Sequence, residues 1–589
     1  MIYQTIISFN LCFFILLIST ILSSKLSSVK TIDIGFIFLI FSTLPIFIGG
    51  FICFIINFNF NFNFNFYTNI IFFIFNIILA IYVFKKSKVN FKQLFHLNFK
   101  SEFRNFDKII ISIFLFLLFL IAITPLTDAD SIIYHLNFAK VFFNELQYNT
   151  NILYSLIGYI EFFNILPFFL GSTNFISIHS FILFIILFFW ILKNENIEKN
   201  KKFLIYLTIS CPVLFYSFDG EKPFLIGIFL MTYVLLDNLT TKNTKIFSKY
   251  FILTLLPLVK LNFIIPSLLL IIYFLFLDHQ KKEIKSNIIV KVMILSFITY
   301  LPLLTFKFIN FHNPFAPFLY DFFPSEFSNI GINLLLDAKT YVHGSSLINE
   351  TKSLFQLLNT LININKIYNT IGIGIIIILL FFIKNIKKFN NKIVIFLLLS
   401  LIVNLITTPY SPRFFLPMYL IICIFLLYSG NKMITLKNNL FLAVLKIQLV
   451  FVILMMTIFC YINMNIFLKE DMKKAVYSYD KATKLNKIFS KNQKVITGAS
   501  IFYNFINIPI VNLSYSMDET DVNNFKNKIL KEKFEYYVSD TEIKKFFTSK
   551  KNISLSNPLF HCFSLKDRIN VKIGNKTNYF KEIFLKIDV

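Results

Sequence analysis

Residues 124–143, TPLTDADSIIYHLNFAKVFF, follow an uncharged apolar run over residues 109–123 and place Asp128 and Asp130 where the chain leaves that run. After the second aspartate, apolar residues recur at spacings that suit a helix lying along a membrane surface. Acidic side chains at a membrane boundary are costly when they lose water, so they either face solvent or take part in chemistry. The stretch therefore predicts a membrane-spanning helix, an acidic turn and then an interfacial helix.

The composition is that of a polytopic membrane protein, because 56% of the 589 residues are hydrophobic and 80 are phenylalanine. The formal net charge is +26, which by itself would suit a nucleic-acid partner. The lysines, however, lie in short clusters between apolar runs, as in the cytoplasmic loops of membrane proteins. We therefore expect a lipid bilayer as partner and no nucleic acid. The six cysteines form no metal-binding or disulfide spacing.

Basic clusters orient the chain in the membrane. The densest cluster lies between residues 85 and 108 and predicts a cytoplasmic loop. Asp128 and Asp130 follow one span later, so we expect them on the external side of a bacterial inner (plasma) membrane.

Three stretches test this orientation. Residues 153–170 carry Glu161 and are predicted to be re-entrant or interfacial, because the next span, 175–192, already returns the chain to a basic loop. Residues 203–218 and 224–239 are predicted to form spans joined by a short external turn of residues 219–222. The apolar block 250–277 has Lys260 near its middle and basic loops at both ends, which predicts two short helices meeting externally at Lys260.

The composition changes at about residue 469, where a segment of a soluble type begins. Residues 494–497, 508–511 and 536–539 have the pattern of strands, and residues 522–530 have a helical apolar stripe. The predicted fold is an α-helical polytopic membrane protein of about 13–14 transmembrane helices with a small C-terminal α/β extracytoplasmic domain. Its predicted parts are N-terminal helices with the basic loop (1–108), a transmembrane core (109–468) and the C-terminal domain (469–589).

Four short motifs resemble those of one enzyme family. Residues 130–140, DSIIYHLNFAK, resemble the first external loop of GT-C integral-membrane glycosyltransferases, in the bacterial branch similar to lipid A aminoarabinose transferases and protein O-mannosyltransferases. Residues 312–320, HNPFAPFLY, resemble the Asn-Pro-x-x-Pro loop of that family. Residues 413–417, RFFLP, are similar to its late Arg-aromatic-Leu-Pro element, and the Lys260 connection looks like its lysine-containing turn.

The resemblance implies an inverting hexosyl- or pentosyltransferase of GT-C type. Such an enzyme moves a sugar from a polyprenyl-phosphate donor to an extracytoplasmic lipid, polysaccharide or protein acceptor. Asp130 matches the catalytic acid, while Ser131 stands where an acidic neighbour is usual and Asp128 lies two residues earlier, so either aspartate is a candidate base. The candidate substrate-binding residues are Tyr134, His135, Glu161, Lys260, Asn313 and Arg413. Lys260 and Arg413 would stabilise the departing phosphate, arginine through its forked guanidinium.

Each candidate also has a simpler interpretation. Asp128 and Asp130 would serve equally as caps of the following helix. Lys260 and Arg413 could also simply extend their charged ends to the phospholipid headgroups, as lysine and arginine side chains near a membrane surface do. His135 is a candidate packing or orienting residue, and Glu161 is either an acceptor-site acid or an interfacial residue. We expect no cofactor and no metal site. Asp-Ala-Asp resembles a metal-binding motif, however, so a bound divalent cation is the alternative.

Two other functions compete with glycosyl transfer. A polytopic transporter or flippase would also carry intramembrane charges, but it would be expected to show inverted repeats and helices broken at mid-bilayer. No such repeat is visible in the sequence, and the acids cluster at one edge. An O-antigen polymerase or ligase of cell-envelope glycans typically depends on a large late external loop, whereas the acids here lie in an early one.

Overall fold

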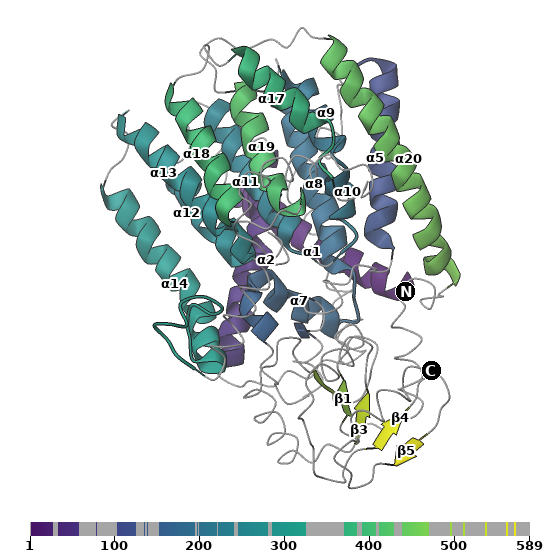
Figure 1. Ribbon diagram of the computed structural model, residues 1–589, viewed down its shortest axis with the longest axis vertical. Coiled ribbons are helices and arrows are strands. Elements are labelled where there is room, and N and C mark those ends of the chain that lie inside the picture. Colours follow the sequence, from purple (N-terminus) through teal and green to yellow (C-terminus); the bar gives the residue numbers. More distant parts are fainter. Residues whose placement is uncertain are drawn as a thin grey trace, which may run out of the picture.

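The protein is a bundle of α-helices with a small sheet near the C-terminus (Figure 1). The computed structural model describes residues 2–26, 33–57, 78, 103–124, 135, 138–139, 152–194, 197, 200–220, 222–240, 246–280, 286–325, 370–385, 391–407, 412–428 and 439–469, and five short strands beyond them. The sequence also predicts a third span that ends at residue 84 and a polar external loop that runs to about residue 369. That span, apart from residue 78, and residues 326–369 of that loop lie outside this part of the chain.

Seven helical segments in the described part are long and apolar enough to cross a membrane. They lie in α1 (Ile2–Leu26), α2 (Ile34–Asn57), α5 (Asn105–Ile123), α8 (Phe175–Lys193), α13 (Ile264–Gln280) with the 3-10 turn η4 (Leu261–Phe263), α14 (Ser286–Phe311) and α20 (Asn439–Lys469). Shorter apolar helices are α7 (Tyr159–Phe169), α11 (Phe224–Thr240), α12 (Ile246–Val259), α18 (Asn391–Thr407) and α19 (Pro412–Tyr428). The chain is therefore a multi-pass helical membrane protein, and the total of about 13–14 crossings stays a prediction.

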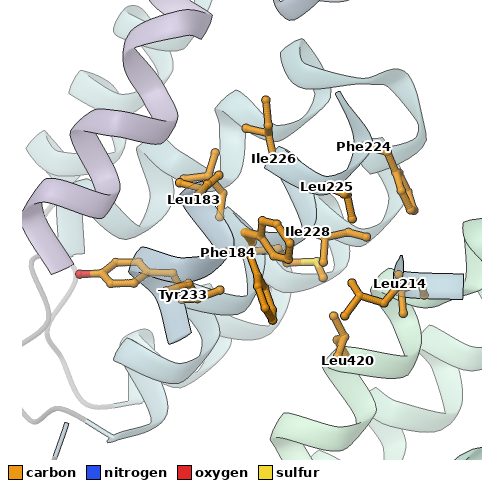
Figure 2. Close-up of a cluster of buried hydrophobic side chains, with 14 of the residues drawn as sticks. Leu183, Phe184, Leu214, Phe224, Leu225, Ile226, Ile228, Tyr233 and Leu420 are labelled. Atoms are coloured by element: carbon orange, nitrogen blue, oxygen red, sulfur yellow. The ribbon is translucent and has the colours of Figure 1, made fainter. Parts of the chain in front are cut away.

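Helix α11 is the centre of the bundle. Every side chain from Phe224 to Leu236 is buried, and a helix that is apolar all round belongs in an interior. Figure 2 shows this core, where side chains of α8, α11, α19 and the short helix α10 (Pro212–Tyr216) converge. Phe184 of α8 packs against Phe229 of α11 with ring centroids 5.5 Å apart.

The predicted span over residues 203–218 is not one unbroken helix. The chain forms α9 (Lys201–Ile209), breaks at residues 210–211 and restarts as α10. Pro212 explains the break, because proline has no N–H for the preceding turn but suits the first position of a new helix. The Ser210 carbonyl at the break accepts a hydrogen bond of 2.7 Å from Nε2 of Gln448 in α20. A neighbouring helix thus satisfies a backbone group that the break releases.

Two buried ion clusters join helices. Asp107 of α5 lies 2.5 Å from Nζ of Lys202 and 2.6 Å from Nζ of Lys446, so it connects α5, α9 and α20. Lys249 of α12 pairs with Asp278 of α13, and Tyr250 donates a 2.8 Å hydrogen bond to the same carboxylate. The second pair lies near the start of α12, at the opposite end of that helix from Lys260.

The C-terminal part contains a five-stranded sheet of order β2-β1-β3-β4-β5. The strands are β1 (Val495–Thr497), β2 (Ile510–Asn512), β3 (Tyr536–Val538), β4 (His561–Phe563) and β5 (Asn570–Lys572). β1 runs parallel to β2 and β3, β3 runs parallel to β4, and β4 runs antiparallel to β5. The first three strands overlap stretches predicted as strands. The predicted helical stripe lies outside the described residues, so an α/β domain stays a prediction.

Candidate functional site

Four of the polar candidates that the structure describes lie at helix ends: Glu161 where α7 begins, Lys260 where α12 ends, Asn313 after the end of α14 and Arg413 where α19 begins. Five of the predicted site residues are described, namely His135, Glu161, Lys260, Asn313 and Arg413. Asp128, Asp130 and Tyr134 lie outside the described residues. The described part of the site therefore consists of the other five candidates.

Glu161 lies in the first turn of α7 and is completely buried. Its Oε2 accepts a 2.8 Å hydrogen bond from the backbone N–H of Gly158, which closes the N-terminus of the helix. The helix has 11 residues, so it is about 16 Å long, roughly half of the ~30 Å hydrocarbon core. This length fits the prediction that the stretch around Glu161 does not cross the membrane.

Glycine lets α7 enter this position. A Cβ at Gly49 of α2 would overlap the backbone carbonyl of Tyr159. A Cβ at Gly158 would come within 2.7 Å of the carbonyl oxygen of Val259, at the end of α12. The start of α7 thus packs closely against α2 on one side and against Val259, the last residue of α12, on the other. A side chain larger than that of glycine would not fit at Gly49 or at Gly158.

His135 and Glu161 form the centre of the site. Nδ1 of His135 lies 2.8 Å from Oε1 of Glu161, and both side chains are fully buried. The structure thus places His135 against Glu161 of α7, and it brings together two residues that were predicted separately. The pairing is compatible with the simpler interpretation of His135 as a packing or orienting residue.

Basic side chains from several elements act electrostatically on the pair. Burial lowers the pKa of His135 well below its usual value, and the positive charges of Lys260, Lys222 and Arg413 lower it further. Burial raises the pKa of the Glu161 carboxyl, and Lys260 and Lys307 oppose that shift. The four cations are therefore close enough to act on this pair electrostatically.

Lys260 lies at a helix break, as predicted. Helix α12 ends at Val259, η4 follows Lys260, and α13 begins at Ile264. The carbonyl of Lys260 accepts a 3.0 Å hydrogen bond from the N–H of Phe263, which forms the 3-10 turn. The break places Lys260 directly after the α12 end against which Gly158 packs.

The sequence predicts an external turn over residues 407–417, but Arg413 lies in the first turn of helix α19. Pro412 begins this helix, a position that proline favours because no N–H is needed there. The Arg413 guanidinium carbon lies 4.8 Å from the ring centroid of Phe414. The helix therefore presents this cation at its N-terminal end, where the helix dipole also favours an anion.

Two cations of the site were missed in the sequence. Lys307 is 3% exposed in the last part of α14 and donates a 2.7 Å hydrogen bond to the carbonyl of Ala316. Lys222 is buried just before α11. An ionisable residue inside an apolar span is a functional-site signal, so Lys307 could have been selected. Lys222 has no such signal, because it follows a short polar turn.

Asn313 stabilises its own loop. Its Nδ2 donates a 2.7 Å hydrogen bond to the carbonyl of Phe318, and its Oδ1 accepts a 2.9 Å bond from the N–H of Phe315. Both ends of the side chain are used in this way. The structure therefore places Asn313 in the loop frame, and a contact with substrate stays a prediction.

The arrangement combines a buried acid–imidazole pair, suited to holding or moving a proton, with positive charge suited to an anionic group. Within the described ranges, no three histidine, cysteine, aspartate or glutamate side chains group into a potential metal site. The Asp-Ala-Asp motif lies outside those ranges.

Comparisons of the chain with protein-family models, with curated proteins and with solved structures find no match. The resemblance to GT-C transferases accordingly depends on the motifs of residues 128–417 and on the chemistry of the site.

Proposed function

We propose that the protein is an inverting membrane glycosyltransferase that moves a sugar from a polyprenyl-phosphate donor to an extracytoplasmic lipid, polysaccharide or protein acceptor. The observation that carries the proposal is the buried His135–Glu161 pair, on which the charges of four basic side chains act electrostatically. Glycosyl transfer from a lipid phosphate needs positive charge at the leaving group and a proton acceptor at the attacking group. The lipid-facing helices supply apolar surface for the polyprenyl chain.

In the proposed reaction, an acceptor hydroxyl or amine attacks the anomeric carbon of the sugar. A carboxylate, Asp130 or its neighbour Asp128, takes the proton of the attacking group. The bond between the anomeric carbon and the phosphate oxygen breaks, and its electron pair stays on the polyprenyl phosphate. Lys222, Lys260 and Arg413 supply the positive charge that stabilises this phosphate.

Glu161 has a positioning role in this proposal. Its carboxyl group holds the His135 ring at 2.8 Å and is itself held by the Gly158 N–H. Because His135 lies only five residues after Asp130, the pair would fix the segment that carries the proposed base. We therefore assign Glu161 to orienting the acidic turn rather than to accepting the proton.

Arg413→Ala is expected to weaken binding of a polyprenyl phosphate by about 1.5–3 kcal/mol, the range for a hydrogen bond to a charged group. Arg413→Lys should restore only part of the loss, because lysine lacks the guanidinium fork. The measurement is binding of polyprenyl phosphate and of uncharged polyprenol to the purified protein in nanodiscs. Lys392→Ala, at the start of α18, is the matched control. Equal affinities of wild type and Arg413→Ala would show that Arg413 does not bind the phosphate.

The function is tested most directly by deleting the gene and profiling envelope glycans and lipid-linked sugars. Loss of one glycan modification with accumulation of its polyprenyl-linked donor on the external leaflet is expected. Accumulation confined to the cytoplasmic leaflet would instead indicate a flippase, and an unchanged profile would overturn the proposal. Complementation with wild type and with Asp130→Asn separates catalysis from the mere presence of the protein.

We propose further that the protein lies in a bacterial inner membrane, with the Asp128 loop, the Asn313 loop and a C-terminal α/β domain (469–589) outside. The separation of basic loops from these segments supports this orientation. Reporter fusions after Asn144 and after Gln493 should both report export. Cytoplasmic reporter activity at either position would contradict the orientation and the proposed external active site.

A further inference from the structure

Helix α14 has a lipid-facing side that continues past the end of the helix. α14 is the candidate span with the smallest buried share among the described helices, and Figure 1 shows it at the margin of the bundle. Phe297, Leu301 and Phe308 are exposed along it. Beyond its end, the segment 313–323 exposes further large apolar side chains, namely Phe315, Phe318, Leu319 and Phe322. Phe322 is the most exposed of these at 77%.

The backbone of this segment is hydrogen-bonded within itself. The N–H groups of Phe318 and Phe322 donate to the carbonyls of Phe315 and Leu319, at 2.9 and 3.1 Å. The Asn313 side chain donates to the Phe318 carbonyl and accepts from the Phe315 N–H, and Lys307 donates to the Ala316 carbonyl. Non-helical backbone can enter a lipid environment only where its polar groups have such partners. The segment thus meets that requirement at these positions.

Polar residues limit how deep the segment can lie. His312 and Asp321 are exposed beside the aromatic side chains, and a charged side chain at the bilayer centre is costly. Large aromatic side chains next to polar groups suit the boundary between headgroups and acyl chains. The exposed apolar set and its polar neighbours are therefore consistent with a shallow position.

We infer that residues 313–323 form a membrane anchor that inserts Phe315, Phe318, Leu319 and Phe322 among phospholipids at the level of the headgroup–acyl boundary. The occupant of this apolar surface is the bilayer itself, because the surface continues the lipid-facing side of α14. Lys307 ties the anchor to the helix and also acts electrostatically on Glu161. The anchor would thereby set the depth of the polar site relative to the membrane surface. This inference stands independently of the proposed enzymatic reaction.

Tryptophan fluorescence can test the anchor cleanly, because Trp190 is the single tryptophan of the chain. In a Trp190→Phe background, Phe322→Trp places one reporter in the segment. The full-length protein is reconstituted into phosphatidylcholine vesicles that carry bromine at a shallow or a deep acyl position. We expect blue-shifted emission that is lost mainly with shallow bromines, with little quenching by aqueous iodide.

Two further tryptophan variants serve as references for a lipid-exposed and a buried position. Phe308→Trp, on the exposed side of α14, should be quenched by brominated lipid, whereas Phe306→Trp, which is 1% exposed, should resist both quenchers. Quenching of Phe322→Trp by iodide alone would place the segment in water and overturn the inference. Resistance to both quenchers would mean that protein covers the segment, which also overturns it. Phe318→Trp repeats the test if Phe322→Trp does not fold.

Discussion

Replacement of Asp130 by asparagine is expected to lower sugar transfer at least ~100-fold, the smaller end of the effect of losing general-base catalysis. Asparagine nearly preserves the size of the side chain but cannot accept the proton of the acceptor group. Donor binding should change little, because the proposed phosphate contacts come from Lys222, Lys260 and Arg413. The measurement is single-turnover transfer in membranes, together with polyprenyl-phosphate binding, at matched protein levels.

Asp128→Asn is the control for this prediction. If Asp128 only caps the following helix, its replacement should cost little, since a cap contributes about 1 kcal/mol and asparagine caps well. Near-normal transfer by Asp130→Asn with loss in Asp128→Asn would move the base two residues upstream. Normal transfer by both variants would remove the catalytic assignment and leave the capping interpretation.

Asp278→Ala is expected to lower the free energy of unfolding by about 3–5 kcal/mol, because it leaves a buried ammonium without its carboxylate. Lys249 and Asp278 are 3% and 5% exposed. The ammonium of Lys249 lies 5.0 and 4.9 Å from the ring centroids of Tyr250 and Phe274. Such cation–π contacts are weaker than the lost ion pair. Denaturant unfolding in detergent gives the change.

The double variant Lys249→Met, Asp278→Leu distinguishes the buried charge from general disruption. Apolar replacement of both partners is often neutral or stabilising, so the double variant should be markedly more stable than Asp278→Ala. Asp321→Ala, at an exposed aspartate, is the surface control and should change stability by no more than about 0.5 kcal/mol. Equal losses in the single and double variants would show that packing, rather than the ion pair, accounts for the effect.

Helix breaks show which local features a sequence reveals. The break at Lys260 was predictable, because a charged residue inside an apolar block between two basic loops cannot belong to a single crossing. The break before Pro212 was missed, although proline at the first position of a helix is a known signal. The hydrogen bond from Gln448 that satisfies this break comes from a helix more than 200 residues later, which no local pattern reveals.

In the candidate site, too, some residues were predicted from local motifs, whereas their contacts were not. Lys260 and Arg413 were selected from motifs, and the described structure brings both into electrostatic contact with His135. Glu161 was predicted as a substrate-binding candidate or an interfacial residue, but its pairing with His135 was not foreseen. The pairing needed α7 to enter beside α2 and α12, which depends on the absence of a side chain at Gly49 and Gly158.

The sequence by itself determined that this is a multi-pass helical membrane protein, because apolar length and lysine distribution are properties of the chain alone. It also marked Lys260 as the junction of two helices. Only the tertiary structure decided that Glu161 meets His135, that Lys222 and Lys307 lie near them, and that Asn313 serves its own loop. The physical reason is that burial, pairing of charges and close backbone contact arise between segments far apart in the chain, and local spacing carries no record of them.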